Sequence, residues 1–299
     1  MSSFTIMVDT SYDLPQEYLD EHGINVIPIP FNLDGIQHSG GRWQEISDIA
    51  FYDALGSGSV AGTALINPEA FVGLFTEYAE RGEELLIILL SSGLSGTYHN
   101  SVIALAEVKE KYPGCRIYSI DSLNAAGGVG LVTTLAVKKR AEGLSLEETA
   151  KWLDDYRQNC ISLFTVDDLM FLHRGGRLSK LQAIAGSIIG IKPLLNVAPD
   201  GTLKLKDKVR GRKAALATLC KQLMRSVDTG AGLGTVIISH SNCRHDAQAL
   251  AGMIRSSVGV KEIIIDMMGP VIGAHVGPGC VALFFEGSMT RPEYEAKFY

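Results

Sequence analysis

Residues 85–98, LLIILLSSGLSGTY, decide the fold of this 299-residue chain. The six residues from Leu85 to Leu90 are all apolar, which is typical of a central parallel strand buried on both faces. A Ser/Gly turn follows at once and leads into a helix pattern that begins near Thr97. A parallel strand followed by a turn and a helix is the repeating unit of α/β proteins, so this stretch predicts an α/β layer fold.

The same turn also predicts a ligand site. Ligands of open α/β sheets bind at the carboxyl ends of the strands, and a helix N-terminus favours an anion. The hydroxyls and backbone N–H groups of residues 91–97 converge at such a place. The alternative is that these residues only cap the helix, because Ser and Gly are common there.

Strand and helix patterns alternate along the rest of the first half of the chain. Further strands are expected at 4–8, 25–30 and 116–120, and helices at 97–111 and from Ser145 to about residue 158. Ser145 is followed by Glu148 three positions later, which is the pattern of a capping box.

The second half has a different pattern, with more strands and fewer helices. Strands are expected at 161–166, 194–197, 203–205, 235–239, 261–266 and 280–285, with a helix at 246–257. The triplet Pro199-Asp200-Gly201 predicts a hairpin between two of these strands.

We therefore predict two α/β domains. Residues 1–160 form an N-terminal domain with a mostly parallel sheet, flanking helices and the Ser/Gly anion-binding turn. Residues 161–299 form a C-terminal domain with a mixed or antiparallel sheet, helices, and two loops, GGR at 175–177 and GAHVGPG at 273–279.

Composition excludes several classes of protein. The chain has 33 acidic and 27 basic residues, a net charge of −6, and 46% hydrophobic residues, unlike disordered or fibrous proteins. A negative net charge gives no general attraction to nucleic acid or to an anionic membrane. Its longest dense apolar run is too short to span a bilayer, and the first residues do not resemble a secretory signal, so we expect a cytoplasmic protein. The five cysteines are scattered, which favours reduced thiols over disulfides or a zinc site.

Glycine is unusually frequent, at 32 residues, and one cluster forms a second turn after the strand at 116–120. This turn, DSLNAAGGVG at 121–130, lacks the G-x-G-x-x-G spacing of a dinucleotide site. Close packing of a helix on a strand explains its glycines better than a phosphate does.

Other candidates for binding are basic or imidazole groups. His275 lies in the Gly/Pro-rich segment 273–279, where an imidazole can donate to a carboxylate, although a lone histidine is more often structural. Segment 173–177, HRGGR, can present a guanidinium to a phosphate or carboxylate. Segment 204–213 holds six basic residues and one acid, which is either a solvated face or a docking patch. Nucleophile-elbow and P-loop motifs are absent from the sequence, so the favoured ligand is a carboxylate or phosphate attached to an apolar group.

Several ordered motifs resemble those of the DegV family of bacterial fatty-acid-binding proteins. The closest match is SSGLSGTY at 91–98, which is similar to the family's S-S-x-L-S-G-T-Y signature. The others, in the family's order, are VDTSYDLP at 8–15, Asp121-Ser122, LHRGGR at 172–177, Lys192-Pro193, KVRG at 208–211 and GAHVGPG at 273–279. The resemblance covers nearly the whole chain.

This resemblance implies a ligand and its contacts. Such proteins hold a long-chain fatty acid in an apolar tunnel, and by motif position its carboxylate meets Thr63, Ser92 and His275, with Ser95 and the Gly96 N–H close by. The resemblance implies no metal and no cofactor other than the bound acid.

The resemblance also implies a partner. In fatty acid kinase systems a separate ATP-binding kinase subunit converts the bound acid to acyl-phosphate, so the chain is expected to be a substrate-binding subunit without catalytic residues of its own. Arg177 is then a candidate for contact with the phosphate, and Arg210 for contact with the kinase. Two alternatives remain: a self-sufficient phosphotransferase of the dihydroxyacetone-kinase type, and a lipid carrier without a kinase partner.

The chain departs from the family pattern after Thr63. Where the family often has T-S-Q-P-S-P, this chain has TALINP at 63–68, so that Ala64 and Leu65 replace a serine and a glutamine. If the missing polar groups hold the head group, its position or the choice of acid differs here.

Overall fold

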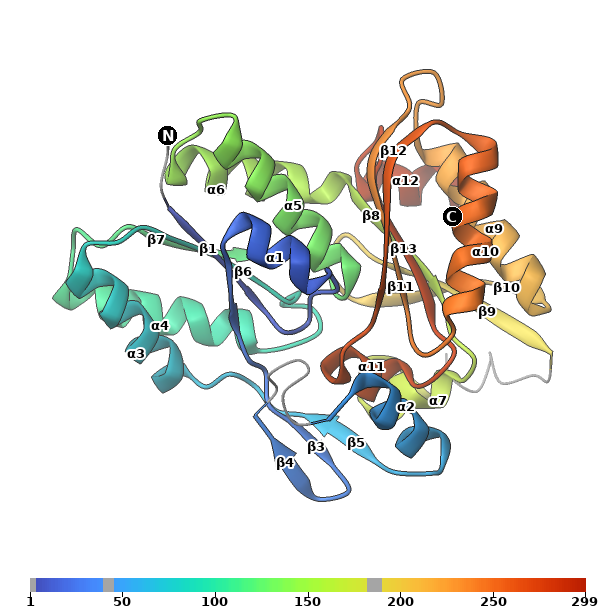
Figure 1. The fold of residues 1–299 in the computed structure, drawn as a ribbon, viewed down its shortest axis with the longest axis horizontal. Helices are drawn as coiled ribbons and strands as arrows, with labels where there is room; N and C mark the ends of the chain where they lie inside the picture. Colours follow the sequence, from blue (N-terminus) through green and yellow to red (C-terminus); the bar gives the residue numbers. More distant parts are fainter. Residues whose placement is uncertain (1–3, 40–45, 182–189) are drawn as a thin grey trace.

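The computed structural model describes residues 4–39, 46–181 and 190–299. Figure 1 shows two large sheets with helices around them and a small third sheet beside them. The predicted α/β class, with a parallel sheet in the first half and a mixed sheet in the second, is confirmed.

The first sheet is parallel and has four strands in the order β2-β1-β6-β7. Its strands are β1 (Thr5–Asp9), β2 (Ile24–Ile27), β6 (Leu85–Leu89) and β7 (Ile117–Asp121). Strand β6 is buried along its whole length, because helices cover both faces of the sheet. One face is covered by α3 (Pro68–Arg81) and α4 (Thr97–Lys111). On the other face lie α5 (Gly127–Ala141) and α6 (Leu146–Tyr156), and α6 begins at Ser145 with the predicted capping box.

The second sheet is mixed and has six strands in the order β10-β9-β8-β13-β11-β12. Its strands are β8 (Cys160–Thr165), β9 (Ile191–Val197), β10 (Leu203–Arg210), β11 (Leu233–His240), β12 (Val260–Met267) and β13 (Val281–Glu286). Only β11 and β12 run parallel, and β9 and β10 form the predicted hairpin. Helices α9 (Arg212–Ser226) and α10 (Arg244–Ser257) pack on its outer face. The other helices of the described residues are α1 (Gln16–His22), α2 (Asp48–Gly56), α7 (Leu169–Arg174), α11 (Pro270–Val276), α12 (Arg291–Phe298) and the short η1 (Arg157–Asn159).

Helix α5 lies between the two sheets and contacts strands of both. Residues 127–137 of α5 are all buried, and the first turn of the helix is rich in glycine. A Cβ at Gly127 would lie 2.6 Å from Ile237 and 2.8 Å from Phe284, and the Gly127 N–H donates to Ser239 Oγ. The second glycine turn thus allows close helix packing, as the sequence favoured, and one core joins both halves of the chain.

A small antiparallel sheet was not predicted from the sequence. It contains β3 (Phe31–Leu33), β4 (Ile36–His38) and β5 (Ala61–Thr63), in the order β4-β3-β5. Strands of three residues are too short to show a recognisable alternation of apolar and polar residues. Strand β5 contacts α11, and this contact brings Thr63 to the C-terminal half of the chain.

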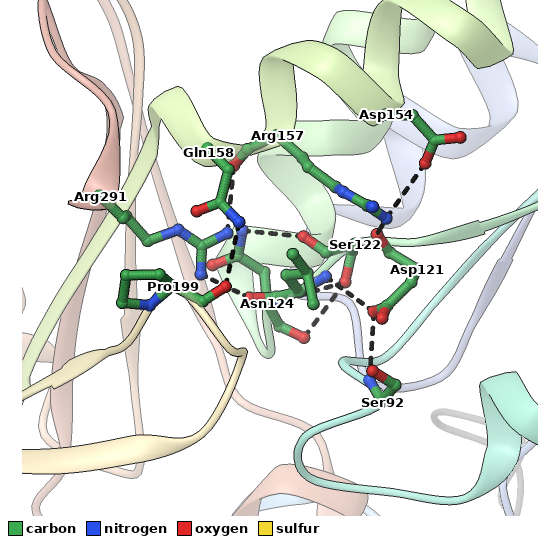
Figure 2. A network of polar contacts seen from close by, with 10 residues as sticks. Ser92, Asp121, Ser122, Asn124, Asp154, Arg157, Gln158, Pro199 and Arg291 are labelled. Atoms are coloured by element: carbon green, nitrogen blue, oxygen red, sulfur yellow. Dashed lines mark hydrogen bonds and ion pairs between the residues drawn. The ribbon is translucent and has the colours of Figure 1, made fainter. Parts of the chain in front are cut away.

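A buried arginine connects two turns and the short helix η1 (Figure 2). Arg291 is only 1% exposed, and its guanidinium donates to the carbonyl oxygens of Leu123, Ala198 and Arg157 at 2.7–3.1 Å. Burial lowers the pKa of Arg291 to about 10, so the group remains charged at neutral pH. These hydrogen bonds fix the turn after β7 against the hairpin turn between β9 and β10.

Replacing Arg291 should therefore destabilise the fold. In Arg291→Met the three carbonyls lose their donor, and we expect the free energy of unfolding to fall by about 3 kcal/mol. Arg255 is exposed on α10, and Arg255→Met should change it by less than about 0.5 kcal/mol. Urea denaturation measures both; equal effects of the two substitutions would contradict this role of Arg291.

Candidate functional site

A cavity lies between the inner face of the second sheet and the elements that face it. It encloses about 730 Å³ of empty space, including its opening to solvent. Apolar side chains from both halves of the chain line most of it: Ile29, Ala64, Leu90, Leu94, Ala125, Ala126, Phe164, Leu172, Val197, Leu203, Met268, Val271, Ile272, Val276, Ala282 and Phe284. The other described lining residues are Thr63, Ser95, Arg177, His275 and Cys280.

Thr63 and His275 meet at the polar part of the lining. Thr63 ends β5, His275 lies in the last turn of α11, and Thr63 Oγ1 is 2.9 Å from His275 Nε2. Burial, and secondarily the charge of Arg177, lower the pKa of His275 to about 4, so its imidazole is neutral at pH 7. Nδ1 of His275 is buried without a hydrogen-bond partner among the described residues, and a Cβ at Gly175 would lie only 2.3 Å from it.

The position of His275 corrects one expectation. The segment 273–279 was predicted to be a loop, but its first four residues belong to α11. Pro270 starts this short helix, and Gly273, Ala274 and Val276 are buried, so the glycine here serves packing. Likewise His173 and Arg174 end α7, and only Gly175 and Gly176 form a turn before Arg177.

Arg177 brings a positive charge to the same part of the cavity. Its Nε donates to Leu94 O at 3.1 Å, and its Nη1 donates to Gly175 O. Burial lowers the pKa of Arg177 from its usual 12.5. Among the described residues no Asp or Glu forms an ion pair with Arg177. The thiol of Cys280, which also lines the cavity, is neutral because burial raises its pKa. Arg177 is thus the one charged side chain in the described lining.

Ser95 reaches the cavity from the Ser/Gly turn. Its Oγ accepts a hydrogen bond from the Thr97 N–H at 3.2 Å and donates one to Thr97 Oγ1 at 3.1 Å, so it satisfies the first backbone N–H of α4 from the position before the N-cap Gly96. Capping and ligand contact are therefore compatible roles for this serine. Gly96 is the next residue and does not line the cavity; a Cβ there would lie 3.2 Å from Leu65.

The other two predicted site residues lie away from the cavity. Ser92 is exposed, and its backbone N–H donates to Asp121 Oδ1 at 3.1 Å (Figure 2). Arg210 is exposed at the end of β10, an edge strand. The structure thus brings together Thr63, Ser95, Arg177 and His275, but neither Ser92 nor Arg210 joins them.

The departure from the family pattern lies at the cavity wall. Ala64 lines the cavity directly after Thr63, whereas Leu65 is 47% exposed and contacts Gly96. The apolar residues of α11 and β13 in the lining were not singled out from the sequence, because buried apolar residues look alike whether they fill a core or line a cavity.

In residues 4–39, 46–181 and 190–299, no group of three or more His, Cys, Asp or Glu side chains is placed to hold a metal ion. The helices in those ranges include none with the length and hydropathy to cross a membrane.

The neutral state of His275 predicts a pH dependence of stability. In the unfolded chain the pKa of His275 returns to about 6.5, so the unfolded state takes up a proton first as the pH falls. The contribution of the neutral imidazole to the free energy of unfolding is therefore fully present above pH 6.5, and it decreases as the pH falls from 6.5 to 4. Between pH 7.5 and pH 5 the free energy of unfolding should fall by about 2 kcal/mol more in the unmodified protein than in His275→Gln. Urea titrations measure this, with His99→Gln, an exposed site on α4, as the control; identical pH dependence in His275→Gln and the unmodified protein would contradict the assignment.

Comparison with known proteins gives consistent matches over the whole chain. A DegV domain-containing protein of Clostridium perfringens is 37% identical over 98% of this chain and 100% of its own length. A solved DegV lipid-binding protein of Thermotoga maritima is 30% identical, with a TM-score of 0.83 over 97% of this chain and 100% of that one. A solved DegV family protein of Thermus thermophilus, described as binding fatty acid, is 28% identical, with a TM-score of 0.83 over 95% and 99% of the two chains. The DegV family model matches residues 3–288, and the chain belongs to the DegV family.

Proposed function

We propose that this protein binds a long-chain fatty acid in the cavity on the inner face of the second sheet. The observation that carries the proposal is the chemical character of the cavity lining. The lining is apolar except at the part formed by Arg177, His275, Thr63 and Ser95. An amphiphile with one anionic group and a long apolar chain matches that lining. The fatty-acid-binding relative of Thermus thermophilus and the lipid-binding relative of Thermotoga maritima support the same ligand class.

The carboxylate is assigned to the polar part of the cavity. A buried carboxylate is very costly unless it is paired and hydrogen-bonded, and Arg177 supplies a charge that lacks an acidic partner in the described chain. Thr63 and the neutral imidazole of His275 share one hydrogen bond, so one of the two is left to donate to the carboxylate. The Ser95 hydroxyl donates to the carboxylate when it turns away from Thr97 Oγ1. Ser95 takes the role that the resemblance gave to Ser92, because Ser95 lines the cavity and Ser92 is exposed.

The acyl chain is assigned to the apolar remainder. Each methylene removed from water contributes about 0.8 kcal/mol, so a long chain supplies most of the affinity and the head group supplies its orientation. Ala64 and Leu94 then lie beside the first carbons of the acyl chain. Ala64 follows Thr63, and the Leu94 carbonyl accepts a hydrogen bond from Arg177.

Substitutions at the polar part test this assignment. Thr63→Val and Ser95→Ala each remove one hydroxyl, and we expect each to weaken fatty acid binding by about 1 to 3 kcal/mol, the cost of an unpaired buried polar group. Ser92→Ala is the matched control within the same turn and should leave binding unchanged. Titration with a fluorescent fatty acid measures all three, together with thermal melting to verify folding; a loss in Ser92→Ala but not in Ser95→Ala would overturn the assignment.

We further propose that the bound acid is presented to a separate ATP-dependent kinase subunit. This part rests on the ordered motifs of the sequence. Arg177 at the head group is the candidate for contact with the phosphate, and Arg210, exposed beside Lys208 on the edge strand β10, is the candidate for contact with an acidic surface of the kinase.

A reconstituted reaction tests the kinase proposal. With an ATP-binding subunit from the same host, Arg210→Glu should reduce acyl-phosphate formation at least about tenfold through reversed charge, with fatty acid affinity unchanged. Lys261→Glu, an exposed site on β12, is the control. Hydroxylamine trapping measures acyl-phosphate. Product formed by the isolated chain would instead indicate a self-sufficient phosphotransferase, and bound acid that no host subunit phosphorylates would indicate a carrier.

A further inference from the structure

The cavity has a second, apolar end on the inner face of the six-stranded sheet. The four head-group residues come from β5, α11 and two turns, and none comes from this sheet. The sheet contributes Phe164, Val197, Leu203, Ala282 and Phe284 instead. A chain with its carboxylate at Arg177 therefore directs its methyl end towards these strands.

One row of residues across the sheet marks where this end stops. In this row Leu203 of β10 pairs with Val197 of β9, and Ser162 of β8 pairs with Phe284 of β13. Strands β9 and β8 are antiparallel, and Asn196 pairs with Leu163. One step further along this register, Val197 lies opposite Ser162, which completes the row. Leu203, Val197 and Phe284 all line the cavity. Ser162 lies between Val197 and Phe284 in the row, but it is not among the described lining residues.

The side chain of Asn124 covers Ser162. Ser162 Oγ donates to Asn124 Oδ1, and both residues are buried, with exposed fractions of 1% and 0%. Asn124 Nδ2 donates to Ser122 O at 3.2 Å, and Asn124 O accepts from the Ser91 N–H at 2.9 Å. A Cβ at Gly128 would lie 2.7 Å from Asn124 Oδ1, so the amide is held between α5 and β8. Figure 2 shows Asn124 and Ser122 within this polar network.

We propose that the hydrogen-bonded pair of Asn124 and Ser162 sets the longest acyl chain that the cavity accepts. This inference rests on the proposed fatty acid binding. A chain that ends before the pair gains affinity with each methylene, whereas a longer chain must displace a buried amide whose hydrogen bonds it does not replace. The affinity therefore rises with chain length up to a limit and then falls.

A double substitution tests the limit. Asn124→Ala with Ser162→Ala removes both partners, so neither is left as an unpaired buried group. Measured over a series of saturated acids of increasing length, the limit should move to longer chains. The first acid beyond the original limit should bind about tenfold more tightly than it does to the unmodified protein, as expected for about two newly accommodated methylenes. An unchanged limit would overturn the proposal.

The control removes a different hydrogen-bonded pair outside the cavity, in which Ser101 is buried and Ser119 is partly buried. Ser101 Oγ and Ser119 Oγ lie 2.6 Å apart between α4 and β7, and Ser101→Ala with Ser119→Ala should leave the limit unchanged. A shift in this control as large as in the test variant would also overturn the proposal. If the unmodified protein binds no acid of any length, the proposed function itself fails, which is distinct from binding with an unmoved limit.

A second variant decides the question if the double variant does not fold. Val197→Phe adds volume beside Ser162 in the same row, where the wall borders empty space. The limit should then move to shorter chains, with short acids bound as before. An unchanged limit would show that the methyl end lies elsewhere.

Discussion

The close packing of helix α5 between the two sheets is the constraint on which the rest of the structure depends. Gly127 and Gly128 leave no room for side chains against Ile237, Phe284 and Asn124, so the first turn of α5 sits directly on the second sheet. Ala125 and Ala126, just before that turn, then form part of the cavity wall. The two sheets consequently share one core, and the cavity lies beside the start of this helix, between the inner face of the second sheet and the segments that face it.

The chemistry of the cavity follows from what can be buried in it. Apolar side chains lose nothing on leaving water, whereas the guanidinium of Arg177 loses hydration and gains only carbonyl contacts from the described chain. Its charge also helps to keep His275 neutral. An anion at this position would offset the cost of burying Arg177, and it would favour the protonated form of His275. The polar part of the cavity is thus arranged for a negative head group.

Local signals in the sequence predicted much of the fold. Consecutive apolar residues identified β6, and the helix at 97–111 and the capping box at Ser145 were correct because short-range patterns determine them. Local patterns did not predict the non-local contacts: only the family resemblance placed Thr63 near His275, which it reaches through the small sheet. The start of the Gly-rich segment around His275 lies in a helix that no local pattern indicated. The motif alone does not distinguish Ser92 from Ser95, because three positions along one turn decide which hydroxyl faces the cavity.

The most direct test of the proposed binding mode is a crystal structure with a fatty acid that carries bromine on its terminal carbon. Anomalous scattering locates the bromine independently of the rest of the ligand. If the acid binds as proposed, one bromine peak lies beside Val197 and Phe284, with the carboxylate at Arg177, Thr63 and Ser95. A bromine peak at Arg177, or an acid bound outside the cavity, would contradict it.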